Sequence, residues 1–179
     1  ALDIFRAIMK YMEDLPRGKM SDVELVQIIM QYGLDRPEQD MSAPQQMTFA
    51  DEIYCQIMKQ CNSNPKPDSL IKGFELLSIC CGMFLPCEAL FPYVIAFAMT
   101  ACEAYANNEA VVNLARDCLD RIAMQKQLPE TMVRRLPPSS QEIMAVVTGG
   151  QMQQLVYFTN SQSKTIDIDN STEIIEFVE

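Results

Sequence analysis

The chain has 179 residues, of which 49% are hydrophobic and 21% are charged, a balance typical of a globular protein rather than a disordered tail. It carries 14 Lys and Arg against 24 Asp and Glu, which gives a formal net charge of −10. Because this charge repels phosphate backbones and anionic lipids, it disfavours nucleic-acid binding and direct membrane binding. We therefore expect the chain to meet membranes only through partner proteins.

Several features that catalytic and metal sites commonly use are missing from the sequence. The chain has no histidine, which removes Ser–His and Cys–His nucleophile pairs, histidine metal ligands and the usual base near neutral pH. Its seven cysteines form no Cys-x-x-Cys pair, and no glycine-rich phosphate loop is present. We therefore expect no enzyme, no cofactor and no metal site, and we expect free, mostly buried thiols in a reducing cytosol.

The first 34 residues predict two helices. Apolar residues between Ile4 and Met12 recur on one face at helical spacing. Ser21 and Glu24 have the spacing of a capping box, in which each side chain binds a free backbone N–H of the other residue, and this box predicts a helix that ends at Gly33. Residues 35–47 contain two prolines and many polar residues, which predicts a long loop.

The next two helices are separated by a short break. Thr48, with Asp51 three residues later, predicts a capped helix that ends before the Asn- and Pro-rich stretch 62–67. Residues 69–84 are apolar on most faces, which predicts a central helix. We expect this central helix to end before Pro86.

Two further helices follow. Residues 87–106 predict a helix of the core rather than a membrane span, because the uninterrupted apolar piece is about half the ~20 residues that a span needs. Asn107 and Asn108 predict the cap of an amphipathic helix, whose outward side we expect to carry charged residues: Arg116, Asp117, Asp120 and Arg121.

The pattern changes near the C-terminal end. Ser139 and Glu142 repeat the capping-box spacing and predict a short helix that ends at Gly149-Gly150. Period-two alternation over 153–158 and 165–169 then predicts a β-hairpin, with a final helix at 173–178. The predicted fold class is mainly α, a helical bundle of roughly six or more helices with a short β-hairpin and a helix stub at the C-terminus.

Three stretches stand out together: Asp51 to Gln60 with Asn64-Pro65, Gly73 to Cys80 with Phe84 and Pro86, and Leu136-Pro137-Pro138-Ser139 to Ile143. Together they resemble the signature segments of the myosin tail homology 4 domain. The departures are a longer interval between Arg36-Pro37-Glu38 and Asp51, and Phe49-Ala50 where the family has a Leu-Arg pair.

Residues 151–179 resemble the start of a FERM domain, since a hairpin and a helix open its ubiquitin-like lobe. The resemblance implies a helical domain at 1–148 and a truncated FERM lobe at 151–179. It further implies a non-enzymatic module of an unconventional myosin tail that is cytoplasmic and cytoskeleton-associated. Together with its own FERM domain, such a module links the motor to cargo or scaffold proteins, membrane receptors or microtubules.

Two sets of candidate contact residues follow. For Gln56, Lys59, Gln60, Lys66 and Lys72 the alternative interpretation is an ordinary solvated helix face. For Asp51 and Glu52 it is a favourable interaction of their negative charge with the N-terminal end of the helix dipole. The candidate partner-binding residues are Asp51, Glu52, Gln56, Lys59, Gln60, Lys66 and Lys72. The candidate residues of the interface with FERM are Arg134, Arg135, Pro137, Pro138 and Glu142.

Other functions stay open at this stage. A kinesin or a non-motor protein carries the same domain pair, and microtubules are a further partner that the acidic net charge disfavours. A helical trafficking adaptor that binds lipid head groups or sorting peptides is the alternative from a different class. It would need a compact basic pocket and no extension at 151–179.

Overall fold

A computed structural model describes residues 2–34, 48–129, 134, 136–148, 150 and 152–168. The chain divides into two compact units, residues 1–138 and residues 139–179. The predicted loop at 35–47 and the predicted final helix at 173–178 lie outside the described residues.

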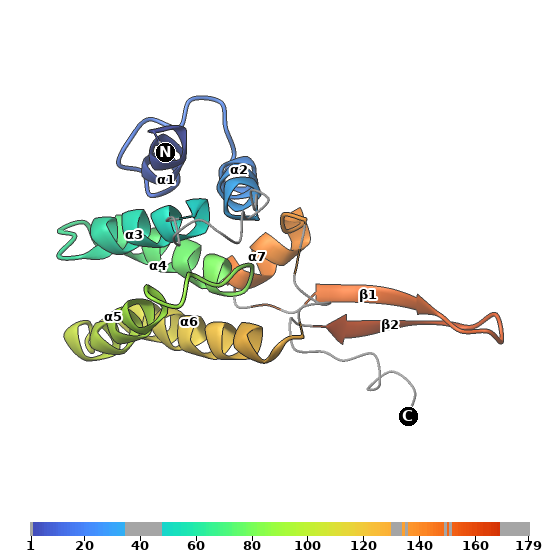
Figure 1. The fold of residues 1–179 in the computed structure, drawn as a ribbon. Coiled ribbons are helices and arrows are strands. Elements are labelled where there is room, and N and C mark those ends of the chain that lie inside the picture. Colours follow the sequence, from blue (N-terminus) through green and yellow to red (C-terminus); the bar gives the residue numbers. More distant parts are fainter. Residues whose placement is uncertain are drawn as a thin grey trace, which may run out of the picture. The chain divides into compact units, whose positions relative to one another are not determined.

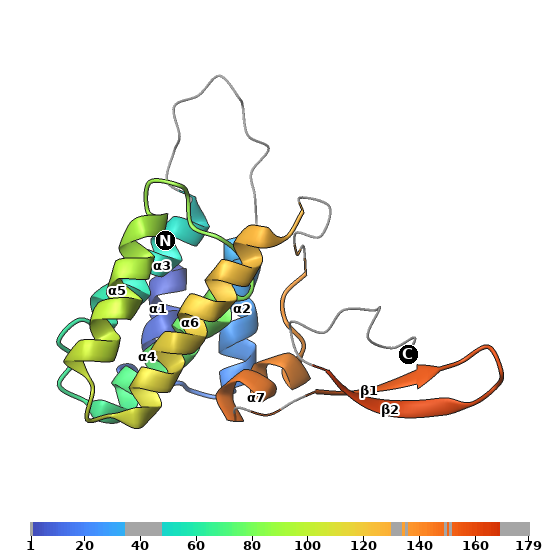
Figure 2. The same ribbon diagram turned by 90° about the horizontal axis from the view of Figure 1, so that it is seen from below.

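The described part of the first unit contains six helices in three layers of two (Figure 1). The pairs α1 with α2, α3 with α4 and α5 with α6 each pack together, and the α3–α4 layer lies between the other two (Figures 1 and 2). The helices are α1 (Leu2–Tyr11), α2 (Asp22–Leu34), α3 (Phe49–Cys61), α4 (Pro67–Cys81), α5 (Phe91–Ala104) and α6 (Glu109–Gln127).

The predicted helix starts are confirmed where the chain carries a capping residue. Thr48 and Asp51 form a capping box at the start of α3, and the Asn108 side chain accepts a hydrogen bond from the backbone of Val111 at the start of α6. Helix α4 starts at Pro67, two residues earlier than predicted, because proline is well suited to the first turn of a helix. Helix α5 begins only at Phe91.

Helix α4 forms the centre of the bundle. Ten of its fifteen residues are buried, among them Phe74, which stacks on Phe97 of α5 with ring centroids 5.7 Å apart. Beyond its end, the backbone carbonyl of Phe84 accepts a 2.8 Å hydrogen bond from the Tyr54 hydroxyl of α3. The prediction of a central helix in this part of the chain is therefore confirmed.

The cysteines of the bundle are free thiols, and four of them are buried: Cys61, Cys80, Cys81 and Cys118. Burial raises the pKa of Cys61 to about 12. It also raises the pKa of Cys80 and of Cys118 well above the usual range. Since the thiolate is the reactive form of cysteine, these side chains act as small apolar groups of the core.

Helix α5 packs in the bundle, as predicted, but with one face only, and Tyr93 and Met99 are 68% and 57% exposed. One prediction about side-chain orientation is wrong. On α6, Asp117 and Arg121 do not point freely outward. The Ser78 hydroxyl of α4 donates a hydrogen bond to Asp117, which Arg121 contacts at 2.6 Å. The tight packing of α6 on α4 draws both side chains towards α4.

The second unit contains α7 (Ser140–Thr148) and a hairpin of β1 (Met152–Tyr157) and β2 (Ser163–Ile168). The strands pair antiparallel, from Met152 opposite Ile168 to Tyr157 opposite Ser163. The backbone N–H of Ser139 donates to Glu142 at 2.6 Å, which confirms the predicted capping box. The fold class is mainly α, as predicted. Among the described residues, no helix has the length and apolar character needed to cross a membrane.

Gly33 offers a test of the packing between α2 and the segment after α4. A Cβ atom at this position would overlap the Phe84 ring, and that ring is already held edge-on by Tyr54 at a centroid distance of 5.8 Å. We expect Gly33→Ala to lower the free energy of unfolding by about 1 to 3 kcal/mol through overpacking, as measured by urea denaturation.

A double-mutant cycle provides the control for this prediction. In a Phe84→Leu background the added methyl group meets a smaller, more adaptable side chain, so Gly33→Ala should cost less there. Equal costs in both backgrounds would contradict the proposed clash.

Candidate partner-binding site

Asp51 lies at the first turn of α3 and is completely buried. One carboxylate oxygen accepts a 2.7 Å hydrogen bond from the backbone N–H of Cys87, 36 residues further along the chain. The other oxygen accepts hydrogen bonds of 2.9 Å from both the backbone N–H and the hydroxyl of Thr48. Asp51 therefore joins the start of α3 to the segment between α4 and α5.

The charge of Asp51 is stabilised by these donors. Desolvation by burial acts to raise the pKa of Asp51, but the hydrogen bonds from Cys87 and Thr48 together outweigh it, and the pKa is lowered. The carboxylate therefore stays ionised in the folded protein. Because its side chain is inaccessible, Asp51 can influence a partner only through the backbone that it holds in place.

The remaining candidates on α3 are partly or fully exposed. Gln56 donates a 2.6 Å hydrogen bond to Glu52 one turn earlier, and Lys59 is exposed in the last turn. The backbone carbonyl of Gln60 accepts a 3.1 Å hydrogen bond from the Asn64 side chain just after the helix. We call the exposed parts of Glu52, Gln56, Lys59 and Gln60 the α3 surface.

Lys66 belongs to a junction that the sequence analysis missed. Its ammonium group contacts Asp14, which follows α1, at 2.9 Å, although the Lys66 side chain is 64% exposed. The same carboxylate accepts a 2.9 Å hydrogen bond from Ser69 at the start of α4. Asp14 lies more than 50 positions from both Lys66 and Ser69 in sequence, so no local spacing predicts this junction.

Lys72 is not brought together with the α3 surface. It lies on α4, where its ammonium group contacts Asp22 at 2.9 Å and Glu13 at 3.9 Å and lies 5.0 Å from the centre of the Tyr11 ring. Arg17 pairs with the same two carboxylates. Lys72 therefore contributes to an ion-pair cluster that ties α4 to α1 and α2.

The candidate residues of the FERM interface lie in the segment before α7 and at its start. Arg134 donates a 2.9 Å hydrogen bond from its side chain to the backbone of Leu136. Pro138 is buried, and its carbonyl accepts a 3.2 Å hydrogen bond from Gln27 of α2. Pro137 is half-buried, Glu142 belongs to the capping box of α7, and Arg135 lies outside the described residues.

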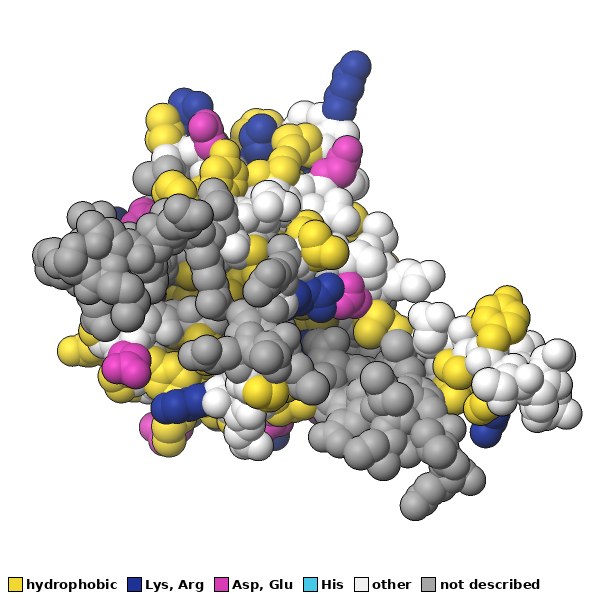
Figure 3. Space-filling view, turned by 45° about the vertical axis from the view of Figure 1, so that its right-hand side comes forward, with side chains coloured by type: hydrophobic (Ala, Val, Ile, Leu, Met, Phe, Trp, Pro, Cys, Tyr) yellow, Lys and Arg dark blue, Asp and Glu magenta, His cyan; other side chains and the backbone are white. Residues whose placement is uncertain are grey.

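Charges of both signs are scattered over the surface of the described residues. Figure 3 shows one face, on which Lys and Arg side chains are interspersed with Asp, Glu and apolar side chains. Within the described ranges no three His, Cys, Asp or Glu side chains gather closely enough to hold a metal ion. On the α3 surface, exposed polar and charged groups are available for contact with another molecule.

Paired helices in three layers, with a polar surface on the middle layer, define the first unit as an α-helical bundle domain. The family model of the MyTH4 domain matches residues 26–145, and the chain belongs to this family. The resemblance to the myosin tail homology 4 domain is thus confirmed. MyTH4 domains are binding modules of motor tails rather than catalytic domains.

Similar proteins include motors of two kinds. The chain is 30% identical to unconventional myosin heavy chain 6 of Caenorhabditis elegans over 99% of its own length and 8% of that protein. It is 25% identical to the kinesin-like protein KIN-14I of Oryza sativa subsp. japonica over its full length and 14% of that protein. The chain thus spans a small fraction of the relatives that it matches.

The fold is also similar to a solved structure of the human myosin 7b C-terminal MyTH4-FERM domain in complex with the harmonin-a PDZ3 domain. The TM-score is 0.71 at 29% sequence identity, and the match covers 96% of this chain and 32% of that one. The likeness to a MyTH4-FERM structure therefore extends beyond residue 145, where the family-model match ends.

We expect Asp51→Asn to lower the free energy of unfolding by about 1.5 to 3 kcal/mol, because it removes charge-assisted hydrogen bonds from a buried site. Glu52→Gln is the matched control, since Glu52 is a partly exposed carboxylate on the next residue, and it should change stability by less than about 0.5 kcal/mol. Urea denaturation of both variants measures the difference. Similar losses in both would contradict a special role for Asp51.

The same substitution has a predictable effect on the pH dependence of stability. Because the folded-state pKa of Asp51 is lowered, its contribution is present above the unfolded-state pKa and is lost as the pH falls through the folded-state value. We therefore expect the difference between Asp51→Asn and the parent chain to shrink on acidification. A constant difference would contradict this assignment.

Proposed function

We propose that this chain is a partner-binding module in the tail of an unconventional myosin, where it acts with a FERM domain to link the motor to cargo or scaffold proteins. The observation that carries the proposal is the MyTH4 match over residues 26–145, in a chain that is similar to a myosin over 99% of its length. Such a tail module is cytoplasmic and cytoskeleton-associated.

We propose that residues 1–148 form the MyTH4 domain and that residues 151–179 form the start of the FERM lobe. The hairpin supports the second assignment. Most described side chains of its two strands are exposed, including Leu155 at 43% and Tyr157 at 77%, and a two-stranded hairpin is marginally stable by itself. A larger lobe would bury these side chains.

The segment before α7 is well placed in sequence to support the FERM lobe. Arg134, Pro137, Pro138 and Glu142 remain the proposed interface residues, together with Arg135. The carbonyl of Pro138 is fixed by Gln27, so the bundle holds the backbone at this point. A fixed backbone reduces the conformational entropy lost when a neighbouring domain docks.

We propose that the α3 surface, extended by the exposed part of Lys66, contacts a partner protein. Lys59 is exposed and makes no ion pair with any described residue, so its charge is available to a carboxylate on another chain. Lys66 already pairs with Asp14, and Lys72 is largely occupied by Asp22. The sharpest single position to test is therefore Lys59.

The class of partner is proposed from a similar protein. The solved human myosin 7b structure contains a MyTH4-FERM domain in complex with a harmonin-a PDZ3 domain. That complex supports a scaffold protein as the partner in this chain as well. It does not locate the contact on the α3 surface.

A kinesin-type tail is the second candidate, favoured by the 25% identity to KIN-14I over the full chain. A module of this type would bind microtubules. The net charge of −10 opposes attraction to the acidic tubulin surface, so binding would need a strong local basic patch.

The proposal is tested with the full-length parent protein carrying Lys59→Glu. Arg116→Glu is the matched control, because Arg116 is an exposed cation on α6. Proteins recovered with the tail are quantified by mass spectrometry, and purified microtubules are tested by co-sedimentation. We expect Lys59→Glu to reduce at least one specific protein partner about tenfold while Arg116→Glu retains it.

Other outcomes separate the parts of the proposal. Loss of every specific partner on deletion of residues 1–138, with none lost in Lys59→Glu, would place binding on the bundle but away from the α3 surface. Salt-sensitive microtubule binding without a protein partner would favour the kinesin-type candidate. Partners retained in full after deletion of residues 1–179 would overturn the proposed function.

A further inference from the structure

The outward side of α5 is apolar although it is exposed. Tyr93 is 68% and Met99 57% exposed, and Ala96 between them is exposed as well. At about 100° per residue, Ala96 lies opposite the buried side of the helix, with Tyr93 and Met99 about 60° to either side. We call the exposed residues Pro92, Tyr93, Ala96, Met99 and Thr100 the α5 outer face.

Helix α6, which packs beside α5, provides a comparison with an ordinary solvent-exposed face of this bundle. Helix α6 exposes polar and charged side chains along most of its length, whereas Glu103 is the single charged residue within α5. An exposed apolar surface of this kind, with acidic residues at its rim, is characteristic of a contact with another molecule.

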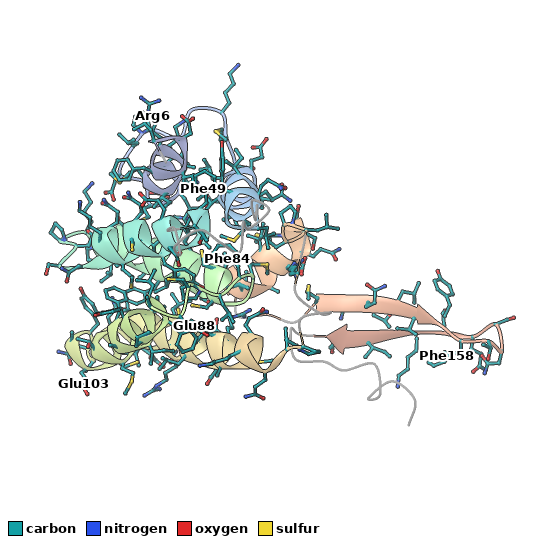
Figure 4. The ribbon with its side chains drawn as sticks, viewed as in Figure 1. Arg6, Phe49, Phe84, Glu88, Glu103 and Phe158 are labelled. Carbon is teal, nitrogen blue, oxygen red and sulfur yellow. The ribbon has the colours of Figure 1, made fainter. Side chains whose placement is uncertain are left out.

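Acidic side chains lie at both ends of this face. Glu88 precedes α5 and Glu103 lies in its last turn, and Figure 4 shows them towards opposite ends of the helix. Both are exposed, and neither forms an ion pair with a described residue. Lys126 of α6 lies near the start of α5, but its ammonium group is placed over the Phe91 ring, 4.3 Å from the centroid.

From this arrangement we propose that the α5 outer face docks an amphipathic helix of a partner protein, with basic residues at both ends of the partner's apolar stripe. The small Ala96 lets a helix approach closely, while Tyr93 and Met99 provide apolar contact on its two sides. Methionine adapts its shape to irregular surfaces. Apolar residues at i, i+3 or i+4 and i+7 of the partner would fill this face.

Charge complementarity indicates that the partner segment is basic. Helix α5 has 14 residues and is about 20 Å long, so Lys or Arg residues about four turns apart would reach Glu88 and Glu103 together. The net charge of −10 also steers a basic segment towards this chain.

The same charges disfavour two other occupants. If α5 paired with α5 of a second copy, Glu103 would lie near Glu88 in the antiparallel arrangement and near another Glu103 in the parallel one, so like charges would meet in both. An anionic membrane would be repelled by these carboxylates. A basic helix is the occupant that gains from them.

This contact is separate from the α3 surface, because α5 lies in an outer layer and α3 in the middle layer of the bundle (Figure 1). It therefore does not depend on which protein the α3 surface binds. Lys59→Glu should leave it intact, so failure of the proposed function and failure of this inference can be told apart.

The probe is a fluorescent helical peptide of about 18 residues with a leucine stripe and two lysines at each end, titrated with residues 1–179 in an anisotropy measurement. We expect saturable binding that weakens with salt. We expect a peptide with glutamates in place of the lysines, or with the leucines scrambled, to bind at least about tenfold more weakly.

Variants of the chain locate the site. Met99→Lys should weaken binding about tenfold or more, and Glu103→Lys several-fold. Asp120→Lys, on the exposed side of α6, makes the same charge change as Glu103→Lys and is its matched control. It should have little effect, as should Lys59→Glu. Circular dichroism checks that each variant is folded. The inference is overturned if Met99→Lys and Asp120→Lys bind the peptide equally well.

The other occupants are tested with the same variants. Dimerisation in sedimentation equilibrium that Met99→Lys abolishes would overturn the inference and place a second copy on the α5 outer face. Binding to phosphatidylserine or phosphatidylcholine vesicles that Met99→Lys abolishes would overturn it in favour of a lipid surface.

Discussion

A single buried carboxylate holds together parts of the bundle that are distant in sequence. Asp51 satisfies the free backbone N–H groups at the start of α3 and, through Cys87, fixes the segment that leads from α4 into α5. Since burial of a charge is costly unless every oxygen is hydrogen-bonded, this position accepts little variation. Both proposed contact surfaces depend on it, because α3 and α5 carry them.

The centre of the bundle relies on packing rather than on charge. Helix α4 is buried along most of its length, and the raised pKa values of the buried thiols keep Cys61, Cys80 and Cys118 neutral. Ion pairs are found at the edges of α4, where Asp14 and the cluster around Lys72 join it to α1 and α2. Partner binding can therefore change the surface without disturbing the core.

The sequence predicts well those features whose signal is local. The capping boxes at Ser21, Thr48 and Ser139 and the hairpin were all found, because each depends on residues within a few positions of one another. The junction at Asp14 was missed, since its partners are more than 50 residues away. The apolar composition of α5 indicates that part of this helix is shielded from water. It does not show which side of the helix packs on its own chain.

The surroundings of the charged residues in the candidate site could not be predicted from local sequence patterns either. Sequence placed seven residues in one partner-binding set, yet the structure gives them different surroundings: Asp51 is buried, Lys66 and Lys72 face carboxylates of their own chain, and Lys59 is exposed. A charge that is already paired adds little attraction for a partner, because the new contact must replace the old one. In an acidic module, recognition therefore depends on charges that are exposed and unpaired, and those at the ends of α5 are negative.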